Sequence, residues 1–286
     1  MTALDPTDLL AHLQRESTRF RDVLATTPAV AKVPGCPDWS AADLLWHLTE
    51  VQWFWAEVVR TRPAAPSEDA PAPVRPAAYD DQLALFDQHG SALLEELRRA
   101  DPADAAWTWS AEQTVGFTYR RQALEALVHR VDAEQTAGEA TPVDPVLAAD
   151  GVLEALDVMF GGTPAWGRFE GAGEHVRVDC TDTGDRVWVE LGRFTGTDPA
   201  TGTSYDEPDI GVVADPGRAP DAVVAGPAAL LLTWLWRRPD PGDTADAADT
   251  TTDTATDTDD SATRLDVTGD PDVHARFAAI VDQPLN

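Results

Sequence analysis

The sequence predicts a two-domain fold, mainly α followed by α+β: an N-terminal four-helix bundle over residues 1–160 and a small α+β domain over residues 161–286. Three observations lead to this prediction. The length of 286 residues suggests two domains of about 150 residues each. Apolar residues recur at helical spacing through the first half, whereas from Gly161 onward short segments alternate apolar and polar residues as strands do. Such a change of period favours a helical domain followed by a mixed one.

Four helices are expected in the first domain, each with an apolar stripe. Asp5 followed by Pro6 is an N-cap with a first-turn proline, and Ser40 with Asp43 has the spacing of a capping box. The expected helices span about 5–26, 40–61, 77–99 and 118–136, and a fifth spans about 146–160. Residues 33–38 are interpreted as a rigid loop, and the Pro/Ala-rich residues 62–76 as a surface linker.

The second domain begins with a predicted hairpin. Residues 175–180 and 186–190 alternate apolar and polar side chains and are joined by the turn at 182–185. Further strands are expected at 209–214 and 264–268, and helices at 226–237 and 270–281. Residues 239–261 consist almost entirely of Asp, Thr, Ala and Gly, which cannot bury enough apolar area to offset their ordering entropy. This segment is predicted to be a disordered acidic insertion.

The composition excludes several classes of protein. Fifty acidic residues against 21 basic ones give a formal charge of −29, which repels nucleic acid and anionic membranes. No run of 18 apolar residues suggests a membrane span, and no secretory signal is evident. Cys36 and Cys180 are too few for a disulfide framework and fall in different halves. We therefore expect a cytoplasmic protein, a monomer or a homodimer, that binds neither nucleic acid nor membranes.

The chemistry-bearing residues gather on the fourth predicted helix. Glu125 and His129 are four residues apart and share one helix face, with Asp132 on the same side, close enough to accept the free ring N–H of His129 or to anchor an arginine. His47, on the second helix, is the candidate for a third ligand. Two imidazoles and a carboxylate are the ligand set of catalytic zinc sites with an open position, and other divalent metals accept it too. Spacing alone equally permits a solvated helix face and a hydrogen-bonded core histidine.

Two motifs resemble a known family. Residues 34–48, PGCPDWSAADLLWHL, resemble the P-G-W-S/T-x-x-D-L-x-x-H-L element of the mycothiol-dependent maleylpyruvate isomerase family, which is part of the DinB-like superfamily of four-helix metalloenzymes. Residues 120–134, RRQALEALVHRVDAE, resemble that family's H-E-x-x-x-H-R-x-D-A-E element. Segments of the C-terminal half resemble the family's small α+β domain, namely 179–182, 226–238 and 267–270.

The resemblance implies a function and a set of site residues. By it, the metal ligands are His47, Glu125 and His129, the metal is zinc or another dication, and mycothiol serves as thiol cofactor. Arg238 matches a family arginine that could hold an anionic substrate or the thiol, although a surface arginine at a helix end is the simpler interpretation. The implied activity is that of an isomerase or thiol S-transferase acting on a small electrophile. Two alternatives stay open: a non-catalytic metal-binding or regulatory module, and a metal-dependent hydrolase that uses no thiol.

Overall fold

The computed structural model describes residues 4–67, 70–239 and 264–283. The chain divides into two compact units, the first comprising Leu4–Pro142 and the second beginning at Val143. The helix α5 (Pro145–Glu154) lies after this division and packs against α6 (Ala228–Leu235), whereas we had expected a boundary at residue 160. A helical period alone does not tell which neighbour a helix packs on. The predicted acidic insertion lies outside the described residues except for Pro239.

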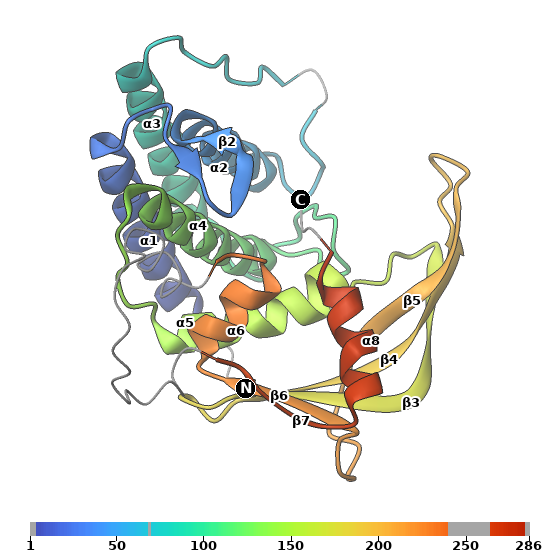
Figure 1. The fold of residues 1–286 in the computed structure, drawn as a ribbon. Helices are drawn as coiled ribbons and strands as arrows, with labels where there is room; N and C mark the ends of the chain where they lie inside the picture. The colour runs from blue at the N-terminus through green and yellow to red at the C-terminus, as the bar shows by residue number, and fades with distance from the viewer. Residues whose placement is uncertain (1–3, 68–69, 240–263, 284–286) are drawn as a thin grey trace, which may run out of the picture. The chain divides into compact units, whose positions relative to one another are not determined.

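The first unit is the predicted helical bundle (Figure 1). Its helices α1 and α4 pack along one another, and α2 packs along α3. The four helices have the bounds α1 Pro6–Thr26, α2 Ala41–Thr61, α3 Tyr79–Arg99 and α4 Val115–Ala137. The core of the bundle is built from fully buried leucines and phenylalanines on these helices, among them Phe20, Leu44 and Leu48. The helical fold of this unit therefore confirms the expectation from the apolar periodicity.

Local capping sets where these helices begin. The Asp5 carboxylate accepts from the Thr7 amide at the start of α1. At the start of α2, Asp43 accepts from the Ser40 amide while the Ser40 hydroxyl accepts from the Asp43 amide, so the predicted capping box is present. The helix α4 starts three residues earlier than expected because Thr114 caps it.

Residues 33–38 are more regular than the predicted loop. Lys32–Val33 (β1) and Cys36–Ser40 (β2) pair as a small antiparallel ribbon directly before α2. Two strands this short carry too few residues for an alternating pattern to be recognised, and prolines in the segment suggested a loop. The ribbon holds Trp39 at the entrance of α2, next to the region where α2 meets α4.

The second unit is the predicted α+β domain, with one mixed sheet in the order β5-β4-β3-β6-β7. After α5 the chain continues as a π-helical turn, η1 (Ala155–Phe160). The strands and the last helix are β3 Gly167–Cys180, β4 Arg186–Thr197, β5 Ser204–Val213, β6 Ala222–Gly226, β7 Asp266–Gly269 and α8 Pro271–Val281. In Figure 1, α8 lies over this sheet, and it contacts β3, β5 and β6.

The sheet is larger than the sequence indicated. Strands β3, β4 and β5 extend beyond the predicted segments, and β6, which runs parallel to β3, was missed. Glycines interrupt the alternation that a sequence search relies on. A Cβ on Gly192 would lie 2.3 Å from the Glu170 carbonyl oxygen and 2.7 Å from the Phe169 ring, so the close approach of the strands requires glycine there. Strand β6 is short and wholly apolar or glycine, and it shows no alternation at all.

No helix among the described residues combines the length and the apolar character that are needed to cross a membrane.

Candidate metal centre

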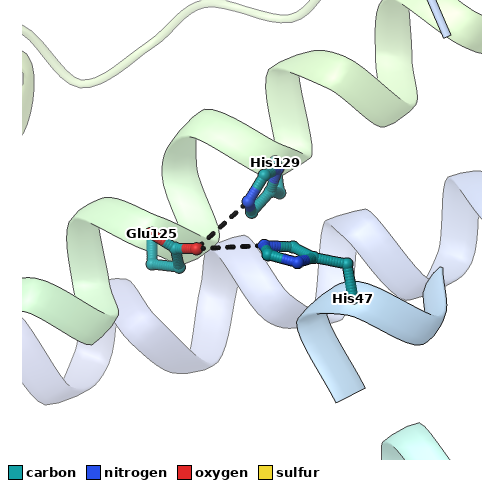
Figure 2. A group of neighbouring side chains, drawn as sticks. All are labelled: His47, Glu125 and His129. Carbon is teal, nitrogen blue, oxygen red and sulfur yellow. Dashed lines mark hydrogen bonds and ion pairs between the residues drawn. The ribbon is translucent and has the colours of Figure 1, made fainter. Parts of the chain in front are cut away.

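Three side chains that are distant in sequence meet inside the first unit. His47 comes from α2, whereas Glu125 and His129 come from consecutive turns of α4 (Figure 2). Glu125 Oε1 lies 3.4 Å from His47 Nε2 and 3.1 Å from His129 Nε2. One ligand atom from each residue can be chosen so that all three lie within 4.8 Å of one another. The structure therefore brings together the three residues that the sequence analysis singled out.

The packing of α2 turns His47 toward α4. Leu44, Leu45 and Leu48 are fully buried and fix the rotation of α2 about its axis. His47 lies between them at the border of the core, and its side chain remains 35% exposed. On α4 the Glu125 and His129 side chains are 15% and 8% exposed. The cluster is thus closed on the α4 side and reaches solvent along the His47 ring.

Asp132 orients the His129 ring. Its carboxylate is fully buried and lies 2.9 Å from His129 Nδ1, as the helical spacing predicted. A proton on Nδ1 is donated to Asp132, which leaves Nε2 as the atom directed at Glu125 and His47. Carboxylate-to-histidine contacts of this kind hold metal-ligating imidazoles in one tautomer and one orientation.

Arg121 holds the other oxygen of Glu125. Its side chain is 4% exposed, and Nη2 donates to Glu125 Oε2 at 2.5 Å. Burial by itself would raise the pKa of Glu125, but Arg121, and after it His129 and His47, lower that pKa well below its ordinary range. Glu125 is therefore an anion at neutral pH, which is the form in which a carboxylate binds a cation.

The pKa of His129 is also strongly shifted. Burial lowers it, but the hydrogen bonds to Asp132 and Glu125 outweigh burial and raise the pKa from 6.5 to about 9. In the absence of a bound cation, His129 therefore carries a proton on both ring nitrogens at neutral pH. A metal ion at Nε2 would take the place of one of these protons.

Two residues near the cluster were not assigned a role by the sequence analysis. The Trp39 ring lies 4.8 Å from the His47 ring and 6.4 Å from the His129 ring, measured between centroids, and so covers one side of the cluster. The second residue that was not assigned a role is Arg121. Its position four residues before Glu125 was the available signal, because oppositely charged residues at this spacing lie on one helix face.

The donor set fits a divalent transition metal. At metal–ligand distances of about 2.0–2.2 Å, the ligand atoms of a tetrahedral zinc ion are roughly 3.3–3.6 Å apart. The two distances from Glu125 Oε1 to the imidazole nitrogens, 3.1 and 3.4 Å, are of this size. Two nitrogens and one oxygen leave a position for an exogenous ligand, as in catalytic zinc sites. Among the described residues, no other group of three such side chains is as close together.

Arg238 follows α6 in the second unit, where Nη1 donates to the Trp236 carbonyl oxygen and the guanidinium lies over the Trp236 ring. Glu50 is exposed on α2. Cys36 and Cys180 form no disulfide. Cys180 is buried, and burial raises its pKa to about 12, in line with a packed apolar role.

Comparison with known proteins identifies similar chains. Residues 10–134 match the family model of the mycothiol maleylpyruvate isomerase N-terminal domain. The crystal structure of the mycothiol-dependent maleylpyruvate isomerase is similar over 84% of this chain and 93% of its own, with 15% identity and a TM-score of 0.53. A crystal structure of a mutant of that isomerase, with one histidine replaced by alanine, is similar over 82% of this chain and 91% of its own, with 15% identity and a TM-score of 0.52. At this identity the likeness shows a shared fold. No curated protein matches the chain.

Proposed function

We propose that this protein is a metal- and thiol-dependent enzyme, because residues 10–134 match the family model of the mycothiol maleylpyruvate isomerase N-terminal domain. In this proposal His47, Glu125 and His129 hold a divalent metal, preferentially zinc, and the cofactor is a low-molecular-weight thiol such as mycothiol. The reaction is an isomerisation or an S-transfer on a small electrophile related to maleylpyruvate. The observation that carries the proposal is the meeting of three ligand atoms, from His47, Glu125 and His129, in a chain that matches a family model named for mycothiol.

The metal, when bound, would supply a positive charge that favours the thiolate form of the cofactor near neutral pH. The side chains around the cluster orient the ligands, keep Glu125 ionised and exclude water. Asp132 keeps Nε2 of His129 facing the cluster, and Arg121 keeps Glu125 ionised and oriented. Trp39 shields one side of the two imidazoles from water, which strengthens electrostatic interactions at the cluster. The partly exposed His47 side leaves a route by which a small molecule can approach.

A thiolate held at this cluster is suited to two related reactions. The thiol, when bound, would supply a nucleophile for addition and elimination at an activated double bond or for displacement of a leaving group. Neither Cys36 nor Cys180 is needed, because the nucleophile comes with the cofactor. We propose a cytoplasmic location, where thiols stay reduced, and the thiol form of Cys36 and Cys180 agrees with it. Arg238 is proposed to bind an anionic group of the substrate or thiol.

The first experiment is elemental analysis of the purified protein. Wild type should hold close to one divalent metal ion per chain, and His47→Ala and His129→Ala should lose it. Glu50→Gln is the matched control, because Glu50 is exposed on the same helix as His47 and only three residues away. A wild-type protein that contains no metal and gains none on incubation with Zn²⁺ would overturn the proposal.

Turnover separates the proposed enzyme from its two alternatives. The metal-loaded protein should convert maleylpyruvate or a related electrophile only when mycothiol is present. Activity toward ester or amide substrates in thiol-free buffer would instead favour a metal-dependent hydrolase that uses a bound water. A protein that holds the metal but neither binds a thiol nor turns over a substrate would be a non-catalytic metal-binding module.

A further inference from the structure

The two oxygens of Glu125 are engaged by different partners. Oε1 faces the Nε2 atoms of His47 and His129, and Figure 2 shows this single oxygen directed at both rings. Oε2 is occupied by Nη2 of Arg121. The carboxylate therefore faces the histidines through Oε1, while the donor from Arg121 holds Oε2.

We propose that Arg121 is a positioning residue that makes Glu125 a one-oxygen ligand and so keeps a coordination position open for an exogenous thiol. This inference rests on the proposed function. A carboxylate without such a partner can bind a cation through both oxygens. The second oxygen would then occupy the place that the sulfur of a thiol needs. By holding Oε2, Arg121 determines how many ligand atoms the protein contributes.

The location of Arg121 suits this role. It lies four residues before Glu125 on α4, so the helix itself sets the separation of the two side chains. Both groups are largely buried, with side-chain exposures of 4% and 15%, and dissolved salt therefore screens their attraction only weakly. A guanidinium stays protonated throughout the accessible pH range, which makes the restraint independent of pH.

Cobalt substitution tests the inference without relying on activity. Co²⁺ replaces Zn²⁺ in sites of this type, and its visible absorption is strong when it has four ligands and weaker when it has five or six. The proteins to compare are wild type, Arg121→Met and Arg121→Lys, each loaded with one equivalent of Co²⁺. Arg120→Met is the control, because residue 120 precedes Arg121 on α4 and its side chain projects roughly 100° away around the helix.

Wild type and Arg120→Met should give the intense four-ligand spectrum. Arg121→Met should give a weaker one, since Glu125 is then able to bind with both oxygens. Arg121→Lys should restore the wild-type spectrum because the ammonium again occupies Oε2. The affinity of the cobalt protein for N-acetylcysteine, followed through its sulfur-to-cobalt absorption band, should fall roughly 10-fold or more in Arg121→Met.

The outcomes separate this inference from the proposed function. If wild type binds no Co²⁺, the metal centre itself is refuted. If wild type binds Co²⁺ with four ligands and Arg121→Met gives the same spectrum and the same thiol affinity, only the positioning role is refuted. Should Arg121→Met fail to fold, as judged by circular dichroism, Arg121→Gln is the substitute. Any neutral side chain of lower donor strength weakens the hold on Oε2, and Arg121→Leu, which has no donor, is compared beside Arg121→Gln, so the same spectral change is expected in the leucine variant.

Discussion

The raised pKa of His129 predicts a steep pH dependence of metal affinity. In the metal-free protein this imidazole is held as a cation by Asp132 and Glu125, against the effect of burial, with a pKa of about 9. A metal ion at Nε2 has to displace a proton whenever the pH lies below that value. Affinity should therefore increase as the pH rises from 7 to 9 and should level off above 9.

The size of the effect follows from the two pH units between 7 and 9. At pH 7 roughly 1% of the metal-free protein has a neutral His129, so the apparent dissociation constant should be roughly 100-fold weaker than at pH above 9. This corresponds to about 2.7 kcal/mol, at about 1.36 kcal/mol for each pH unit. Close to one proton should be released for each Zn²⁺ bound at pH 7.

Competition with a chromophoric chelator between pH 6.5 and 9.5 measures the affinity, and calorimetry in buffers of different ionisation enthalpy counts the protons. Asp132→Asn is the informative variant. It removes one of the two carboxylates that raise the pKa, so the pH dependence should flatten, and its affinity above pH 9 should be roughly 10- to 100-fold below that of wild type because His129 loses its orienting acceptor. A wild-type affinity that does not change between pH 7 and 9 would refute the reasoning.

Three further predictions concern stability and reactivity. Arg130→Met should cost about 3–5 kcal/mol in urea titrations, because the 3% exposed side chain of Arg130 pairs with two carboxylates that would be left largely buried without it. Ser40→Ala should cost about 1 kcal/mol through loss of the cap of α2. The Ser40 hydroxyl, followed by Arg75, lowers the pKa of Asp43 from 3.8 to about 2, so this stabilisation is present above pH 3.8 and disappears as the pH falls through about 2. Iodoacetamide should alkylate half-buried Cys36 well before buried Cys180 in the native protein, as mass spectrometry of timed samples would show.

Each of the three predictions has an outcome that would contradict it. Arg99→Met is the control for Arg130, because the Arg99 side chain is 65% exposed and its ion pairs should contribute less than about 1 kcal/mol. Equal loss of stability in the two variants would contradict a special role for the buried pairs. A Ser40→Ala effect of unchanged size at pH 2, or equal alkylation of both cysteines, would contradict the corresponding prediction.

The first unit was largely predictable because its signals are local. Asp5, Ser40 and Asp43 act on amides two or three residues away, and the apolar stripes follow the period of a single helix. The second unit was harder to predict. The pairing of β3 with β6 joins segments more than 40 residues apart, and Gly192 is required by a contact with another strand that no local pattern reveals.

The same distinction holds for the candidate metal centre. Glu125, His129 and Asp132 lie within two turns of one helix, so the sequence alone determined that they share a face and that Asp132 could receive the His129 proton. The approach of His47, 78 residues before Glu125, depends on how the buried leucines of α2 pack against α4. Only the tertiary structure decided that Trp39 covers the histidines and that His47 and His129 turn their Nε2 atoms to the same oxygen of Glu125. These features depend on packing and on competition among several possible hydrogen-bond partners, neither of which is set by the spacing of residues along the chain.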